Sequence, residues 1–204
     1  MFQIEAVIFD LGRVLVNVDF TRGLFKYYHN SLKENDSETI DRLFNDKLFI
    51  QFTTGKISPP ELYREIVKRF KINLEYKDFV KEWCNVFEPM DGVVNLVQEV
   101  AQNYVVGLLS DTDPLHWEYC LNTFPFLRIF SKPTLSYEIG VLKPTPLCYQ
   151  LAAANVGKSI ANCLFIDDRA INVRGAKEVG MQAILYKNIA QLRRDLLELG
   201  ILKR

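Results

Sequence analysis

The chain has 204 residues, 49% of them hydrophobic, which is enough for one large domain or for a core with a small insertion. Lysine and arginine total 25, as do aspartate and glutamate, and no run of residues is basic enough to indicate nucleic-acid binding. The four cysteines are widely spaced without a CxxC pair, which argues against a zinc cluster and against a disulfide framework. With no basic leader and no apolar stretch of membrane-spanning length, the sequence predicts a cytoplasmic protein that binds neither nucleic acid nor a membrane.

The chain begins with a predicted strand over residues 6–9 and then loses its strand pattern between about residues 20 and 88. This middle segment is rich in aromatic residues, and its apolar residues recur at three- and four-residue spacing, as on one face of a helix. Ser58 and Glu61 have the spacing of a capping box and flank two prolines, a pattern typical of a helix start. The middle segment is therefore predicted to be a small helical insert.

Beyond Asp91, strand and helix patterns alternate, which predicts a parallel α/β sheet with right-handed crossovers. Gly180 is expected to end one of the helices in the left-handed conformation. The expected order is a helix over 93–100, a strand over 105–109, a helix over 116–124, a strand over 134–136, a helix over 146–154, a strand over 163–166, a helix over 172–179 and a strand over 182–186.

Polar residues follow three of the apolar strands directly, and a fourth polar segment contains Lys143. Asp10 ends the first strand, Ser110 the second, and the pair Asp167 and Asp168 the strand over 163–166. The carboxyl ends of parallel strands share one edge of the sheet, where open α/β sheets place their ligands. We therefore expect these side chains to form one site.

The residue types in these segments suit the transfer of a phosphoryl group. A carboxylate such as Asp10 can attack phosphorus and form an aspartyl-phosphate, which divides hydrolysis into two easier steps. Ser110 can donate to a phosphoryl oxygen, and Lys143 can neutralise both Asp10 and the incoming phosphate. Each residue taken alone also has a simple structural explanation, as a turn cap for Asp10 and Ser110 and as a surface charge for Lys143.

Adjacent aspartates at a strand end repel each other unless a cation lies between them. Magnesium is such a cation, since it takes hard oxygen ligands and typically uses one or two carboxylates together with a substrate phosphate. Asp167 and Asp168 therefore predict a magnesium site beside Asp10.

In all four segments, and in their order, the sequence resembles the haloacid dehalogenase superfamily of aspartate-nucleophile phosphohydrolases. The segments are Ile8-Phe9-Asp10-Leu11-Gly12, Leu108-Leu109-Ser110-Asp111-Thr112, Gly140-Val141-Leu142-Lys143-Pro144 and Leu164-Phe165-Ile166-Asp167-Asp168. Within the superfamily, the stretch from Phe9 to Phe20 is most similar to small bacterial sugar-phosphate phosphatases of the α-glucose-1-phosphate phosphatase type. The resemblance covers nearly the whole chain, more loosely between residues 20 and 88.

The resemblance implies a Rossmann-like α/β core over residues 1–19 and 87–204 and a helical cap over residues 20–86 that selects the leaving group. It implies a magnesium-dependent phosphatase, a monomer or weak homodimer, acting on a small phosphorylated metabolite such as a sugar phosphate. Its metal ligands would be the carboxylates of Asp10 and Asp168 and the carbonyl of Gly12, with Asp168 favoured over Asp167 as the direct ligand. Asp167 and Asn172 would orient metal-bound water and Lys143, and Ser110, Asp111 and Lys143 would bind the substrate.

One residue departs from the pattern of most phosphatases in the superfamily. The second residue after the nucleophile is usually an aspartate that acts as general acid and then as general base, and here it is Gly12, as it also is in the relatives that the chain most resembles. Such acid–base assistance is worth roughly 10²–10⁴-fold in rate. Asp111, Asp113 and Asp19 are candidate replacements, and each is also explained as a turn or surface residue.

Two other functions stay open from the sequence. An L-2-haloacid dehalogenase uses the same aspartate nucleophile on carbon without a metal, and the Asp167–Asp168 pair argues against it. A catalytically silent binding protein on the same fold is suggested only by Gly12. Residues that could face the site from elsewhere, each with a packed or solvated alternative, are Arg13, Lys47, Arg64 and Trp83, and the two histidines, His29 and His116, are expected to be structural or solvent-facing.

Overall fold

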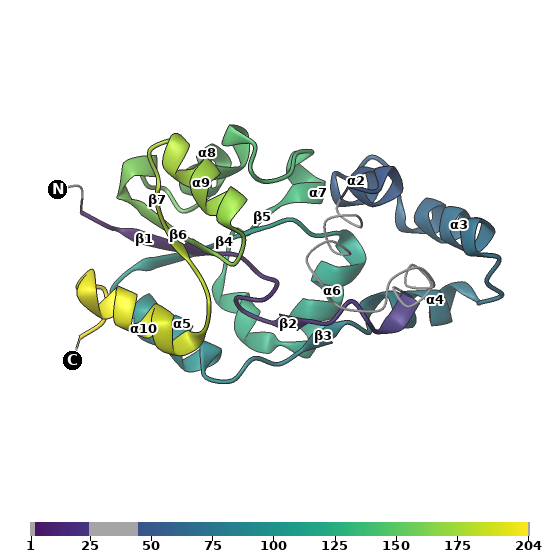
Figure 1. The fold of residues 1–204 in the computed structure, drawn as a ribbon, viewed down its shortest axis with the longest axis horizontal. Coiled ribbons are helices and arrows are strands. Elements are labelled where there is room, and N and C mark those ends of the chain that lie inside the picture. The colour runs from purple at the N-terminus through teal and green to yellow at the C-terminus, as the bar shows by residue number, and fades with distance from the viewer. Residues whose placement is uncertain (1–2, 25–44, 204) are drawn as a thin grey trace.

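A five-stranded parallel sheet forms the centre of the computed structural model, which describes residues 3–24 and 45–203 (Figure 1). The strand order is β5-β4-β1-β6-β7, so that β1 lies in the middle between β4 and β6. The strands are β1 (Ala6–Phe9), β4 (Val105–Ser110), β5 (Thr134–Leu135), β6 (Cys163–Asp167) and β7 (Gln182–Leu185).

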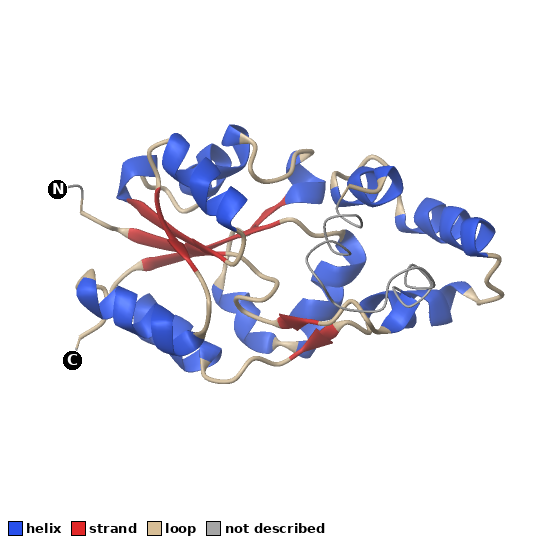
Figure 2. Ribbon diagram, viewed as in Figure 1, coloured by secondary structure: helices blue, strands red, loops and turns tan. Residues whose placement is uncertain are grey.

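Alternation along β1 gives the sheet two apolar faces, each covered by helices. Val7 and Phe9 pack with α5 (Val93–Ala101), α6 (Pro114–Thr123) and α10 (Ile189–Glu198). Ala6 and Ile8 pack on the opposite face with α8 (Pro146–Asn155) and α9 (Ala170–Glu178). In Figure 2, which has the view of Figure 1, α8 and α9 accordingly lie on one side of the sheet, and α5 and α10 lie on the other.

The described part of the middle segment packs around an apolar cluster of its own, at one end of the sheet (Figure 1). Its described helices are α2 (Lys47–Thr53), α3 (Pro59–Phe70) and α4 (Tyr76–Cys84). A two-stranded antiparallel sheet of β2 (Asn17–Val18) and β3 (Phe87–Glu88) joins the chain entering and leaving this segment. The division into a core over residues 1–19 and 87–204 and a cap over residues 20–86 stays a prediction.

The α/β fold predicted from the sequence is confirmed, with small differences at element ends. Ser136 begins helix α7 (Ser136–Ile139) instead of ending strand β5, and its hydroxyl donates to the carbonyl of Thr112 at 3.0 Å. The Glu61 carboxylate accepts from the N–H of Ser58 at 2.7 Å, as the capping spacing predicted. Gly180 has the expected positive φ, of 87°. Helix α10 and the pairing of β2 with β3 were not predicted from the sequence.

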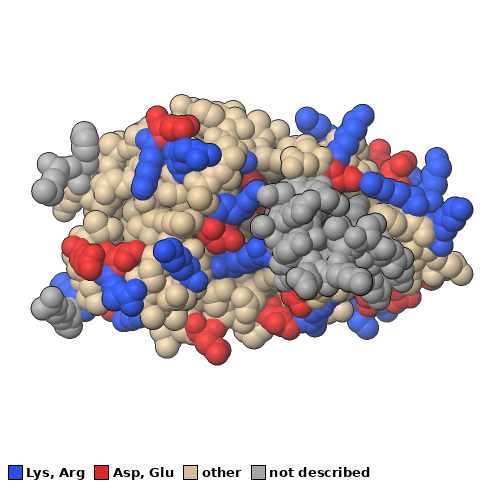
Figure 3. All heavy atoms as spheres, viewed as in Figure 1, with Lys and Arg blue, Asp and Glu red and all other residues tan. Residues whose placement is uncertain are grey.

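The surface carries charges of both signs across the face seen in Figure 3, as the zero net charge leads one to expect. Within the described ranges, no helix has the length and apolar character needed to cross a membrane.

Candidate active site

Strand register brings the predicted site residues together at one edge of the sheet. Phe9 of β1 pairs with Leu108 of β4 and with Ile166 of β6, so the residues that follow these three strands are neighbours. The N–H of Asp10 also donates to the Ile166 carbonyl at 2.9 Å, which extends the pairing by one residue beyond β1. The carboxylate of Asp10 is therefore held where the parallel strands end.

Lys143 joins the three sequence segments through its side chain. Its ammonium group lies 2.8 Å from Asp10 Oδ1 and 2.7 Å from Asp167 Oδ2, and it contacts the Leu109 carbonyl at 3.4 Å. Its backbone N–H donates to Asp111 Oδ1 at 3.0 Å. Burial alone would lower the pKa of Lys143, but the carboxylates of Asp10, Asp167 and Asp111 raise it well above its ordinary value, so the side chain stays a cation.

Asp10 is fixed through one oxygen of its carboxylate. Oδ1 accepts from the N–H of Leu11 at 2.8 Å as well as from Lys143, whereas no described residue hydrogen-bonds Oδ2. Burial, together with the charges of Asp167 and Asp168, raises the pKa of Asp10 well above its ordinary value, and this outweighs the attraction of Lys143. The site thus has an excess of negative charge that one ammonium group does not balance.

The two adjacent aspartates have different surroundings. The carboxylate of Asp167 is fully buried and accepts from Lys143, from the N–H of Arg169 at 2.8 Å and from the side-chain amide of Asn172 at 3.0–3.1 Å. Asp168 accepts no hydrogen bond from a described residue, and burial followed by the charge of Asp167 raises the pKa of its carboxyl. The oxygens of Asp167 are therefore occupied by protein hydrogen-bond donors, whereas the oxygens of Asp168 are available to bind a ligand.

These groups have the composition of a site for a hard cation. Carboxylate oxygens of Asp10, Asp167 and Asp168 lie within 4.8 Å of one another. Asn172 Oδ1 is the single buried side-chain polar atom without a partner among the described residues, and as a carbonyl oxygen it needs a hydrogen-bond donor. Water on a metal would supply such a donor, so the residues fit a hydrated magnesium ion.

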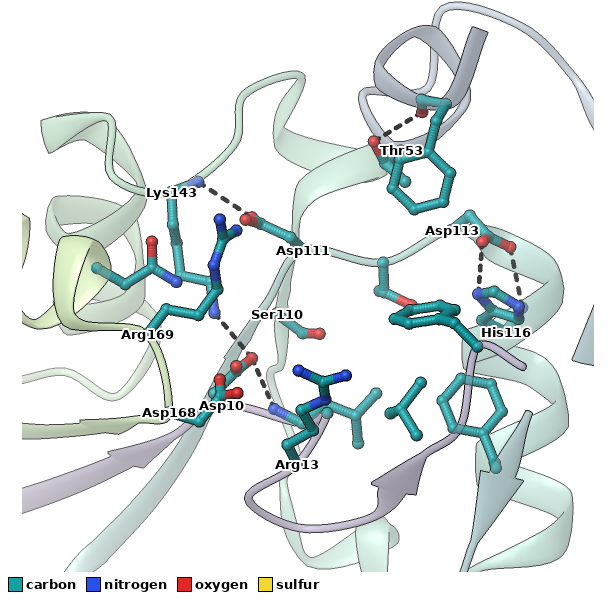
Figure 4. Close-up of a pocket in the computed structure, with 18 residues that line it drawn as sticks. Asp10, Arg13, Thr53, Ser110, Asp111, Asp113, His116, Lys143, Asp168 and Arg169 are labelled. Carbon is teal, nitrogen blue, oxygen red and sulfur yellow. Dashed lines mark hydrogen bonds and ion pairs between the residues drawn. The ribbon is translucent and has the colours of Figure 1, made fainter. Parts of the chain in front are cut away.

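A cavity of about 280 Å³ opens in front of these residues, between the sheet edge and the middle segment (Figure 4). Asp10, Ser110, Asp168 and Lys143 lie toward one side of it, and Asp113 and His116 lie on the other. Apolar side chains line part of the wall, from the loop after β1, from β2, α2 and β3. These are Leu11, Val18, Phe20, Phe49 and Phe87.

The other residues that the sequence offered as possible neighbours of the site have different positions. Arg13 lines the cavity, whereas Lys47 and Arg64 are exposed and do not. Trp83 is buried inside the middle segment and donates through Nε1 to Asp113 Oδ2 at 3.3 Å. Arg169 also lines the cavity. The sequence analysis did not predict it as a site residue, although it directly follows the Asp167–Asp168 pair. His29 lies outside the described residues.

Asp113 and His116 form a buried pair that joins the sheet edge to the middle segment. Asp113 caps α6 by accepting from the N–H of His116 at 3.0 Å, and its Oδ2 lies 2.7 Å from His116 Nδ1. The other ring nitrogen of His116 contacts the Trp83 carbonyl at 3.0 Å. This agrees with the structural role expected for His116 and supports the turn interpretation of Asp113. Asp19 accepts from Thr21 and does not line the cavity.

Comparison with known proteins places the chain among hydrolases. A family model described as haloacid dehalogenase-like hydrolase matches residues 4–180. The D-ribitol-5-phosphate phosphatase of Bacteroides thetaiotaomicron is 24% identical over 201 residues, which cover 95% of this chain and 97% of that protein.

Solved structures agree with this fold. A haloacid dehalogenase (HAD) family enzyme of Bacteroides thetaiotaomicron has a TM-score of 0.80 and 27% identity to this chain, and the match covers 94% of this chain and 99% of that enzyme. Its complex with magnesium and inorganic phosphate has a TM-score of 0.77 and 27% identity, with coverages of 91% and 96%. The L-2-haloacid dehalogenase of Xanthobacter autotrophicus has a TM-score of 0.63, with coverages of 98% and 85%, and at 18% identity the likeness extends to the fold alone.

Proposed function

The chain belongs to the haloacid dehalogenase-like hydrolase family, and we propose that it is a magnesium-dependent phosphatase that hydrolyses a small phosphomonoester through an aspartyl-phosphate intermediate. The observation that carries the proposal is the carboxylate of Asp10, anchored through Oδ1 by Lys143 and Leu11 while Oδ2 faces no protein donor. A similar family member was solved with magnesium and inorganic phosphate, which are the ion that this reaction requires and the product that it releases.

In the first step Asp10 Oδ2 attacks phosphorus as the bond from phosphorus to the ester oxygen breaks; the ester oxygen leaves with that electron pair as an alkoxide, which takes a proton to become the alcohol. In the second step water attacks the aspartyl-phosphate, which releases inorganic phosphate and restores the carboxylate. Lys143 keeps Asp10 oriented and offsets the negative charge that gathers around the phosphoryl group. The hydroxyl of Ser110, which no described residue hydrogen-bonds, would donate to a phosphoryl oxygen.

Magnesium would be held by the carboxylates of Asp10 and Asp168 and the carbonyl of Gly12, and it would screen the phosphate from the carboxylates. The hydrogen bonds of Asp167 support its assignment to an orienting role, because its oxygens are already used by Lys143, Arg169 and Asn172. Asp111 would help to place Lys143 through the bond to its backbone N–H. Residues 20–86 would act as the cap over the leaving group, and a sugar phosphate is the substrate class that the similar phosphatases suggest.

The direct test is Asp10→Asn, measured as magnesium-dependent release of inorganic phosphate from an aryl phosphate. An amide has no anionic oxygen to attack phosphorus, so turnover should vanish while the thermal unfolding profile stays that of a folded protein. Asp91→Asn, at an exposed aspartate away from the cavity, is the matched control and should keep full activity. Retained turnover in Asp10→Asn would remove the nucleophile assignment. Dehalogenation of a 2-haloacid in the presence of a chelator would replace the proposal by dehalogenase chemistry, and inactivity on both substrates would favour a silent binding protein.

A further inference from the structure

Arg13 has a backbone conformation that its residue type disfavours. It has φ of 60°, in the left-handed region, where a side chain with a Cβ is higher in free energy than glycine. The turn around it is tight, since its N–H donates to the Val16 carbonyl at 2.7 Å and the N–H of Leu15 to the Leu11 carbonyl at 2.8 Å. Gly12, one residue earlier, has no positive φ. The chain thus carries a long cationic side chain at the position of this loop where glycine would fit best.

The side chain of Arg13 points into the cavity without a protein acceptor. Arg13 is half-buried, it lines the cavity beside Asp10 and Gly12, and no described residue accepts a hydrogen bond or an ion pair from its guanidinium group. Figure 4 shows the guanidinium reaching from the loop after β1 toward the space below Ser110. A guanidinium has five N–H donors, so a bound ligand with oxygen atoms is the partner that this position lacks.

We propose that Arg13 stabilises the leaving oxygen of the substrate ester, in place of the proton donor that Gly12 cannot supply; this inference rests on the proposed phosphatase function. When the bond from phosphorus to the ester oxygen breaks, the electron pair stays on that oxygen and negative charge builds there. A guanidinium group in a protein is a permanent cation, so it stabilises that charge by its fixed positive charge and its N–H donors and transfers no proton. The departing alkoxide takes its proton from water.

This role differs from simple binding of the phosphoryl group in its dependence on the leaving group. A poor leaving group, such as an alkyl alcohol, develops the most charge on its oxygen and gains most from Arg13. A good one, such as a nitrophenol, leaves as a stable anion and gains little. Binding to the oxygens of the phosphoryl group would instead assist every ester by the same factor.

The test measures single-turnover formation of the aspartyl-phosphate, across aryl and alkyl phosphates, for the natural protein and for Arg13→Gly, Arg13→Lys and Lys71→Gly. Lys71 is the matched control, because it is the other described non-glycine residue with positive φ, at 51°, and it is exposed and remote from the cavity. Removal of one preorganised donor to an oxyanion typically costs about 10²–10³-fold in kcat, so we expect a loss of about that size for alkyl phosphates in Arg13→Gly. The loss for aryl phosphates should be far smaller, Arg13→Lys should recover part of the rate, and Lys71→Gly should leave the rates for all the esters unchanged.

Thermal unfolding with magnesium present supplies a second readout that does not depend on turnover. Because glycine suits this φ, the Tm of Arg13→Gly should equal or exceed that of the natural protein, as for Lys71→Gly. A loss equal for all esters, no loss at all, or a lowered Tm accompanying a general loss would each overturn the inference while leaving the phosphatase assignment intact. If the natural protein hydrolysed none of the esters, the proposed function would fail and the inference with it.

Discussion

Lys143→Met gives a quantitative test of the electrostatics at the sheet edge. In the natural protein the ammonium group lies 2.8 Å from Asp10 and 2.7 Å from Asp167, and the side chains of Lys143 and Asp167 are 2% and 0% exposed. Removing one partner of a buried charge pair costs about 3–5 kcal/mol because the remaining charge is left uncompensated. For a domain of this size each kcal/mol lowers Tm by about 2–4 °C, so without metal at pH 7 we expect a decrease of about 6–20 °C.

A matched exposed pair controls for the loss of a lysine as such. Lys158 lies 2.7 Å from Glu5, as close as Lys143 to Asp167, but these side chains are 31% and 38% exposed. Water and salt screen such a pair, so Lys158→Met should have a far smaller effect on Tm. Denaturant unfolding at two salt concentrations would compare the two variants. Equal losses of stability in both would refute the argument that burial decides the contribution of Lys143.

The pH dependence of Lys143→Met has a definite sign. Burial raises the pKa of Asp10 in the folded protein, and loss of Lys143 raises it further. A carboxyl group with a raised folded pKa favours folding in its protonated form, a contribution fully present below the unfolded pKa of about 4 and lost as the pH rises through the folded pKa. The Tm difference between the variant and the natural protein should therefore narrow as the pH falls toward 4, and a difference that widened would contradict this assignment.

Three further outcomes are expected. Phosphatase activity should require magnesium and should be inhibited by calcium, whose looser shell allows Asp10 to coordinate through both oxygens; full activity in a chelator would contradict this. Gly12→Asp should reduce the dependence of rate on leaving-group pKa in the same ester series, because the new carboxyl group can protonate the leaving oxygen. A Cβ at Gly12 meets only Val18 Cγ2, at 3.2 Å, so the side chain can be accommodated; an unchanged dependence would mean that the carboxyl does not reach the ester oxygen. His116→Gln should lower the free energy of unfolding by about 1–3 kcal/mol in denaturant titrations by leaving Asp113 with one buried partner fewer, and an unchanged value would show that the pair adds nothing to stability.

The sequence alone predicted the α/β architecture, and it predicted which polar residues would meet at one edge of the sheet. Apolar runs that end in Asp10, Ser110 and Asp167 predict buried parallel strands, because a strand covered on both faces is apolar until it leaves the sheet. Parallel strands also share one edge for their carboxyl ends, so topology alone could assemble these residues from distant parts of the chain. Helix ends were less certain from sequence, since they depend on contacts such as the bond from Ser136 to Thr112.

Only the tertiary structure decided how the charged groups divide their partners. The family resemblance favours Asp168 over Asp167 as the direct metal ligand, but the sequence does not give the protein partners of either residue. Folding buries Asp167 against Lys143 and Asn172 and leaves Asp168 without a hydrogen-bond donor among the described residues. The left-handed conformation of Arg13 likewise depends on how the loop closes through the bond to the Val16 carbonyl. The contact of the His116 ring with the Trp83 carbonyl depends on a residue distant in the chain. Strand periodicity depends on neighbours along the chain, whereas the partner of a buried charge depends on which side chains folding brings within about 3 Å.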